Sequence, residues 1–233
     1  MATVPSFFTD MKTALLDNGA VPVVQEMMRI FPDGLVITSG IYALLTVSFP
    51  FAIFFLAMLE ATGLFYLIRW TASYLNISPV SASRKSYSHM CRTGFTDPST
   101  SLLSLSMFQS DPITNSFPSS AIYMLSVASA YIFSTLNTQS KELAALGPAY
   151  ASRYYISAIF LTSLIFLFVC FRIAYSCETF ATVILTVPLG LFIGLILTQL
   201  NLKLFGPEAM NLIGIPLLQS RTANGKKLYV CPK

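Results

Sequence analysis

The strongest constraint on this chain is the run from Leu35 to Ile68, in which Glu60 is the only formally charged residue. Uncharged apolar runs of about 18 residues or more indicate helices that cross a bilayer. As one helix, this run would reach about 50 Å, which exceeds the roughly 30 Å thickness of the hydrocarbon core. A helix over these residues must therefore tilt, protrude from the membrane or break.

Pro50 is the natural position for a kink, because proline removes one backbone hydrogen bond and crowds the preceding turn. Splitting the run into two spans at this proline is less attractive, since the stretch from Leu35 to Phe49 is too short to cross a membrane. We therefore predict a single first span over residues 38–60, with an interfacial anchor just beyond it that consists of Tyr66, Arg69 and Trp70.

Three further apolar runs follow, at residues 119–137, 154–175 and 179–200. The first of these is rich in small and hydroxyl residues, which let helices approach closely, so we expect it inside the bundle. The last two are separated by a very short connection and should form an antiparallel hairpin. The composition agrees with membrane insertion, because only 10% of the residues are charged, against roughly 25% in soluble domains.

The sequence thus predicts an all-α membrane protein with about four transmembrane helices. We divide it into an amphipathic N-terminal segment (1–34), a transmembrane bundle (35–205) and a basic C-terminal tail (206–233). The bundle includes a long irregular extramembrane loop, residues 69–118, between spans one and two, which is interrupted by repeated Pro, Gly and Asp-Pro breakers. The tail carries enough apolar residues to dock on a neighbour as an ordered contact surface.

The basic residues give a prediction of orientation. Lys and Arg split nine to five in favour of the N-terminal segment, the second connection and the tail, over the long loop and the tight hairpin. Cytosolic segments carry the excess of basic residues, so both termini are predicted to be cytosolic. The N-terminus lacks the pattern of a cleaved signal peptide, and the first span is expected to act as its own insertion signal.

Two charged positions touch the predicted spans. Glu60 could mark an ion or proton path, because burying an acid in a membrane is costly and such acids are often functional. If the helix ends near residue 60, however, Glu60 lies at the level of the headgroups, and we favour that interpretation. Arg172 can extend to the same interface as Glu178.

His89 and Cys91 lie close together and are considered as metal ligands, but an ordinary loop is the favoured interpretation because the chain has a single histidine and its other cysteines are remote in sequence. The four cysteines, at positions 91, 170, 177 and 231, contain no CxxC pair and do not indicate a disulfide framework. We therefore predict no metal site and no cofactor.

Familiar catalytic motifs are absent from the sequence, which has no GxSxG, Walker, HExxH or paired-carboxylate pattern, so no enzymatic activity is predicted. The net charge of +4 is scattered along the chain, so no direct nucleic-acid binding is predicted. The sequence also identifies no small-molecule substrate. Gly190 and Gly194 form a GxxxG pattern suited to close helix packing. Specific packing and chance occurrence are both open, with packing inside the chain favoured over packing between chains.

The tail reads GPEAMNLIGIPLLQSRTANGKKLYVC from Gly206 to Cys231. It resembles the tails of small multi-pass membrane proteins of nucleocytoplasmic large DNA viruses, mainly over residues 211–218 and 225–231. Those proteins are associated with the internal virion membrane beneath an icosahedral capsid. The resemblance implies a virion membrane derived from a host endomembrane, with capsid or other membrane proteins as partners, and it supplies no catalytic residue.

The leading hypothesis is therefore a structural protein, of the minor capsid type, that links the internal virion membrane to the capsid shell. The alternative is a small ion channel or pore, similar to a viroporin, that would use Glu60 and the hydroxyl-rich span 119–137. A membrane-bound enzyme of an unfamiliar type is a third hypothesis.

Overall fold

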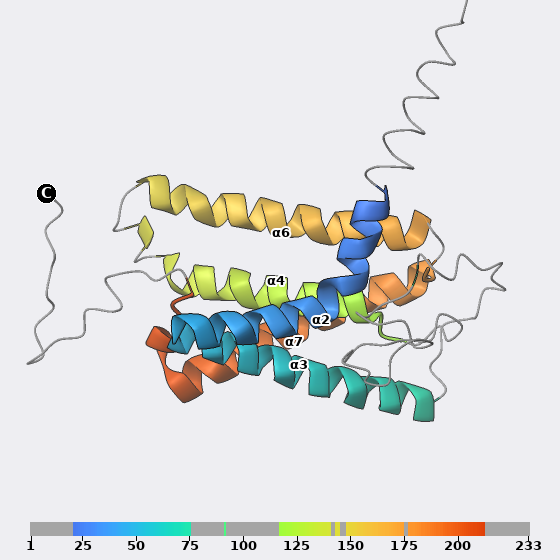
Figure 1. Cartoon of the computed structure of the whole chain (residues 1–233), viewed down its shortest axis with the longest axis horizontal. Coiled ribbons are helices and arrows are strands. Elements are labelled where there is room, and N and C mark those ends of the chain that lie inside the picture. Colours follow the sequence, from blue (N-terminus) through green and yellow to red (C-terminus); the bar gives the residue numbers. More distant parts are fainter. Residues whose placement is uncertain are drawn as a thin grey trace, which may run out of the picture.

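The computed structural model describes residues 21–75, 91, 117–140, 143–144, 148–174 and 177–212. Within these ranges five long helices lie side by side, and no strand occurs (Figure 1). The all-helical prediction is confirmed, and four of the helices, α2, α3, α6 and α7, are long and apolar enough to cross a membrane. The elements are α2 (Val21–Thr46), α3 (Phe49–Tyr74), α4 (Ser120–Thr138), α6 (Pro148–Ala174), α7 (Phe180–Phe205) and the short 3-10 helix η2 (Pro207–Met210).

The prediction of one span over residues 38–60 is wrong. Helix α2 ends at Thr46 and α3 begins at Phe49, so the apolar run contains a turn instead of a kink. Val47 in this turn has a positive φ of 49°, and Pro50 lies in the first turn of α3, where its missing amide hydrogen breaks no helical hydrogen bond. The stretch before Pro50 is long enough to cross because α2 begins upstream of the apolar run.

Helix α2 includes the described part of the N-terminal segment. It begins at Val21, and its apolar portion is Glu26–Thr46. Pro32 lies inside the helix, and the ribbon of α2 bends in its N-terminal half (Figure 1), as expected where proline removes a hydrogen bond. Residues 1–20 lie outside the described residues.

The long loop does not separate the first two spans, because α2 and α3 are joined by Val47 and Ser48 alone. The start of the predicted loop, residues 69–74, is the C-terminal part of α3. From residue 76 to residue 116 the structure describes only Cys91. The segment predicted as a loop therefore follows the second of the apolar helices instead of the first.

Helix α4 is the innermost helix of the bundle and lies among the other four (Figure 1). All of its residues from Ser120 to Tyr131 are buried. Small and hydroxyl side chains suit this position because they permit close approach of neighbouring helices. The prediction that this helix lies inside the bundle is confirmed, and its composition reflects contact with protein on all sides from Ser120 to Tyr131.

Helix α7 approaches α4 closely at Gly190 and Gly194, both of which are buried. A methyl group at Gly194 would lie 2.5 Å from the carbonyl oxygen of Val127, and one at Gly190 would lie 2.7 Å from Cβ of Ser126. No side chain larger than hydrogen fits these positions without moving α7 away from α4. In the described residues, Gly190 and Gly194 therefore contact α4 of the same chain.

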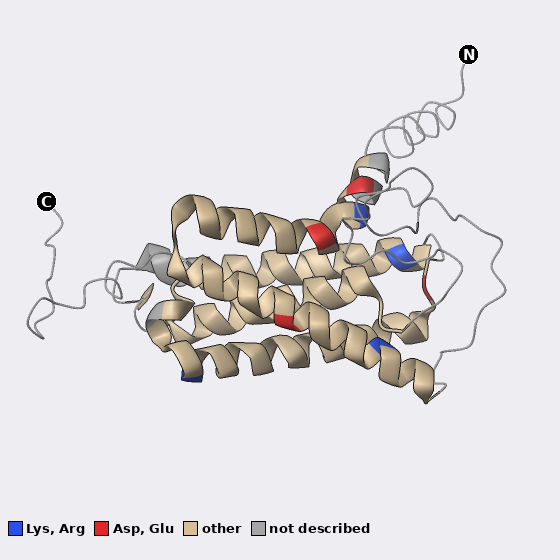
Figure 2. Cartoon of the chain, turned by 60° about the horizontal axis from the view of Figure 1, so that its bottom comes forward, with Lys and Arg blue, Asp and Glu red and all other residues tan. Residues whose placement is uncertain are grey.

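The bundle has two distinct ends. At the end that we call the cap end, Phe31 of α2 packs on Phe168 of α6 with ring centroids 5.3 Å apart. At the opposite end, the tail end, Phe49 of α3 packs on Phe205 of α7 with centroids 6.2 Å apart. Figure 2 shows that charged residues are sparse along the helices and that most of them lie toward the cap end.

The outer faces of the long helices are apolar. Large hydrophobic side chains remain exposed there, among them Ile159, Phe160, Phe166, Phe192 and Leu204. Soluble proteins rarely expose contiguous apolar surface of this extent. These exposed faces, on four helices of spanning length, fit an integral membrane protein.

Candidate functional site

Glu60 lies in the middle of α3, which continues to Tyr74. The sequence prediction placed Glu60 at the level of the headgroups on the assumption that the helix ends near residue 60. At 1.5 Å per residue, Glu60 is about 16 Å from the start of α3, close to the centre of a hydrocarbon core roughly 30 Å thick. The premise that the helix ends near residue 60 is therefore wrong, and the depth of Glu60 in a bilayer stays a prediction.

The Glu60 carboxylate faces the bundle interior on one side. Its Oε2 atom is buried and has no hydrogen-bond partner in the described part of the chain. Because an unsatisfied polar group is costly in apolar surroundings, this carboxylate is the first candidate functional group.

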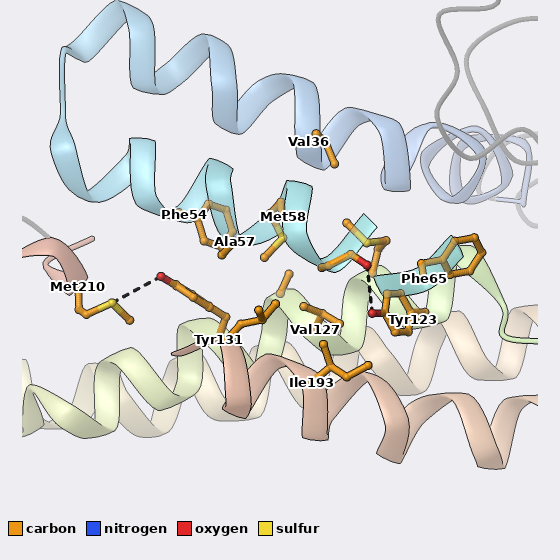
Figure 3. Close-up of a cluster of buried hydrophobic side chains, with 14 residues drawn as sticks. Val36, Phe54, Ala57, Met58, Phe65, Tyr123, Val127, Tyr131, Ile193 and Met210 are labelled. Carbon is orange, nitrogen blue, oxygen red and sulfur yellow. Dashed lines mark hydrogen bonds between the residues drawn. The ribbon is translucent and has the colours of Figure 1, made fainter. Parts of the chain in front are cut away.

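Hydrogen bonds link Tyr131 to the tail end, and Figure 3 shows the one between Tyr131 and Met210. The Asn201 amide of α7 donates to the Tyr131 hydroxyl at 3.4 Å, and that hydroxyl donates to the Met210 sulfur at 3.5 Å. The Gln139 amide donates to the Met210 carbonyl at 2.8 Å. Asn201 and Gln139 are both buried, and each keeps an amide oxygen without a partner in the described residues.

Sequence reasoning did not find Tyr131, Asn201 or Gln139. Asn201 follows directly after the predicted span 179–200 and Gln139 lies just beyond span 119–137, so both fall outside the predicted spans. Helix η2 packs on α3 and α7 at the tail end, and its Met210 accepts the bonds from Tyr131 and Gln139, so this contact encloses the polar groups. A signal that could have found them is the apolar character of Ala209 and Met210, which follow the helix and are buried.

The polar chain is embedded in a packed apolar core. The Tyr123 hydroxyl donates to the Ala61 carbonyl of α3 at 3.1 Å, and the rings of Phe54 and Tyr131 lie 5.4 Å apart. Figure 3 shows Val127 of α4 and Ile193 of α7 in the same buried cluster.

Two grooves among the described helices open sideways, toward the apolar outer surface. One, of about 760 Å³, lies between α2 and α6. The other, of about 300 Å³, lies between α4, α6 and α7. Both are lined almost entirely by apolar side chains, as expected for surfaces that lipid chains or another apolar helix would cover.

A buried ion pair closes the cap end. The side chains of Arg172 on α6 and Glu178 before α7 are only 7% and 10% exposed. Arg172 Nε donates to Glu178 Oε1 at 2.9 Å, and the Ser119 hydroxyl donates to the same oxygen at 2.5 Å. Arg172 also donates to the Cys91 carbonyl at 3.2 Å. The two charges therefore pair inside the protein instead of extending separately to the interface.

Cys91 and Cys177 form a disulfide, with their Cα atoms 5.0 Å apart. The prediction that no disulfide is indicated is wrong, and Cys91 is not a metal ligand. The partners are 86 residues apart in the sequence, and a spacing this long gives no signal before the fold is known. Cys170 on α6 is a free, exposed cysteine, while His89 and Cys231 lie outside the described residues.

No protein-family model matches this chain, and neither a curated protein nor a solved structure matches it.

Proposed function

We propose that this chain is a structural membrane protein that anchors a protein shell to a bilayer, and that the bilayer is the internal membrane of a large DNA virus. The observation that supports a structural role is the filling of the bundle by α4, which is buried from Ser120 to Tyr131. The disulfide and the Arg172–Glu178 pair tie together the segments that meet at the cap end. The resemblance of the tail to tails of viral membrane proteins supports the viral location.

The part of the tail that can reach a partner begins after Leu212. Ala209 and Met210 are each 1% exposed, and the Met210 carbonyl accepts the bond from Gln139. Residues 207–212 therefore belong to the bundle. Residues 213–233 lie outside the described residues and combine four basic side chains with apolar ones, which suits contact with another protein.

Deletion of residues 213–233 tests this role. We expect the truncated protein to insert normally, while its amount in purified particles falls at least about tenfold, which corresponds to about 1.4 kcal/mol of lost binding. Quantitative immunoblots of membranes and of particles measure both quantities. A Gly/Ser segment of the same length controls for chain length. Incorporation of the truncated protein at the wild-type level would contradict the anchoring role, and absence of the wild-type protein from particles would contradict the viral location.

A conduit for protons or monovalent cations is the second candidate function. The observation that favours it is the position of Glu60 in the middle of α3, with a buried unpartnered oxygen and the chain of Tyr131, Asn201 and Gln139 leading to the tail end. Intramembrane acids of this kind commonly mark ion or proton paths.

Flux measurements in liposomes separate the two functions. If the role is structural, liposomes with the wild-type chain leak protons and K⁺ no faster than protein-free liposomes, and Glu60→Gln inserts and assembles like the wild type. Glu26→Gln is the matched control, because Glu26 is an acid on α2 whose side chain is 52% exposed. Wild-type flux that disappears in Glu60→Gln and persists in Glu26→Gln would establish the conduit instead.

A further inference from the structure

The chain enters the bundle at the cap end and leaves it at the tail end (Figure 1). The N-terminal part of α2 lies at the cap end, where Met28 belongs to a buried cluster with Phe168 and Phe171 of α6. The C-terminal end of α7 lies at the tail end, where Phe205 meets Phe49. The five long helices therefore make an odd number of passes along the bundle.

Helix α4 must cross the membrane together with its neighbours. It has 19 residues, or about 28 Å of helix, which matches a hydrocarbon core of roughly 30 Å. Its N-terminal end is held at the cap end, because the Ser119 amide donates to Thr186 and the Ser119 hydroxyl donates to Glu178. Its C-terminal end is held at the tail end by the bond from Gln139 to Met210.

We infer that the chain crosses the bilayer five times, with the cap end in an oxidising compartment such as the lumen of the endoplasmic reticulum and the tail end in the cytosol. Disulfides form and persist in oxidising compartments and are rare in the cytosol. The Cys91–Cys177 bond lies at the cap end, where it joins the segment after α3 to the turn between α6 and α7. This inference rests on the membrane location of the chain and is independent of the structural role proposed above.

The basic residues do not oppose this orientation. With five crossings, the N-terminal segment moves to the same side as the long segment after α3. The split of Lys and Arg then changes from nine to five into seven to seven. An even split gives no preference under the rule that basic residues stay cytosolic, so the disulfide decides the orientation. The two termini lie on opposite sides, in place of the predicted common side.

The orientation also defines the partner surfaces. Residues 213–233 and the connection between α4 and α6 face the cytosol, so a protein that binds the tail must approach from the cytosolic side. Residues 1–20 and the segment around Cys91 face the opposite compartment. Cys91 and Cys177 are oxidised, and on this orientation we expect Cys231 to be a reduced thiol on the cytosolic side.

Glycosylation mapping in full-length chains tests the five crossings. Met11→Asn creates an acceptor with Thr13, Ser104→Asn creates one with Ser106, and Ser220→Asn creates one with Thr222. When the chains are translated with microsomes of the endoplasmic reticulum, we expect the Met11 and Ser104 variants to gain a glycosidase-sensitive mass and the Ser220 variant to gain none. If the Ser104 variant is modified and the Met11 variant is not, the chain crosses the membrane four times. If the Ser220 variant is modified, the orientation is the reverse of the one inferred.

Thiol labelling in the same sealed microsomes gives an independent signal from the cytosolic side. In a Cys170→Ser background, a membrane-impermeant maleimide should label Cys231 without detergent, and should label Cys91 and Cys177 only after detergent and reductant are added. Protection of Cys231 in sealed vesicles would overturn the inference. So would labelling of Cys91 and Cys177 in sealed vesicles, with or without prior treatment by a reductant, because either result would place them in the cytosol.

Discussion

Gly194→Ala in α7 should lower the thermal stability of the protein in detergent by roughly 2–10 °C, the equivalent of about 1–3 kcal/mol of overpacking. The added methyl group would lie 2.5 Å from the Val127 carbonyl oxygen and 2.7 Å from Cβ of Ala130. Both atoms belong to the buried helix α4 and cannot rotate away. The helices must therefore separate, which loosens the contact between α4 and α7.

Gly63→Ala is the matched control, because it makes the same chemical change in another apolar helix. A methyl group at Gly63 would meet nothing within 4 Å, so this variant should unfold at the wild-type temperature or slightly above it, as alanine favours helix more than glycine. The fraction of protein that stays monodisperse after heating measures both variants. Equal stability of the two variants would mean that the contact at Gly194 does not hold α7 against α4.

The helices themselves could be predicted from hydropathy, but their boundaries near Pro50 could not. A proline after a long apolar run is compatible with a kink inside a helix and with the first turn of a new one. The upstream half of α2 carries Glu26, Arg29 and Asp33, which made it resemble a surface segment. In the structure Arg29 pairs with Glu26 at 2.8 Å and Asp33 is fully buried. Local pairing of charges is invisible to an average over a sequence window.

Helix α4 shows what composition can and cannot indicate. Its small and hydroxyl residues predicted an interior position, and that prediction is confirmed by its burial. It is absent from the four helices identified as long and apolar enough to cross a membrane, although it is the most enclosed helix of the bundle. Burial inside the bundle depends on how the helices pack, which composition indicates only in outline.

The groups that define the candidate site come from distant parts of the chain. Asn201 meets Tyr131 across 70 positions, and Cys91 meets Cys177 across 86. Each is an unremarkable residue in its own segment, and only tertiary packing brings the partners together. Glu60 could be identified from the sequence as the one acid in an apolar run, but its depth in the membrane required the correct start of α3.

Arg172→Met is expected to have the larger effect on stability, with a loss of about 3–5 kcal/mol, because it leaves the Glu178 carboxylate buried without a counter-charge. The remaining described donor to Glu178 is the Ser119 hydroxyl, which cannot replace a cation. The cap end should loosen, and the Cys91–Cys177 disulfide should become reducible at lower concentrations of dithiothreitol. Thermal unfolding and titration with the reductant measure these two effects.

The double variant Arg172→Met/Glu178→Gln removes both charges and should regain most of the lost stability, because replacing a buried ion pair by neutral groups of similar volume is often nearly neutral. The coupling energy from the double-mutant cycle should then be about 2 kcal/mol or more, within the range for residues in direct contact. Glu26→Gln, which breaks the more exposed pair with Arg29, should change stability little, since such pairs contribute little. If the double variant is as unstable as Arg172→Met alone, the loss comes from the packing of the arginine stem against the cap end, and the charges do not act as a pair.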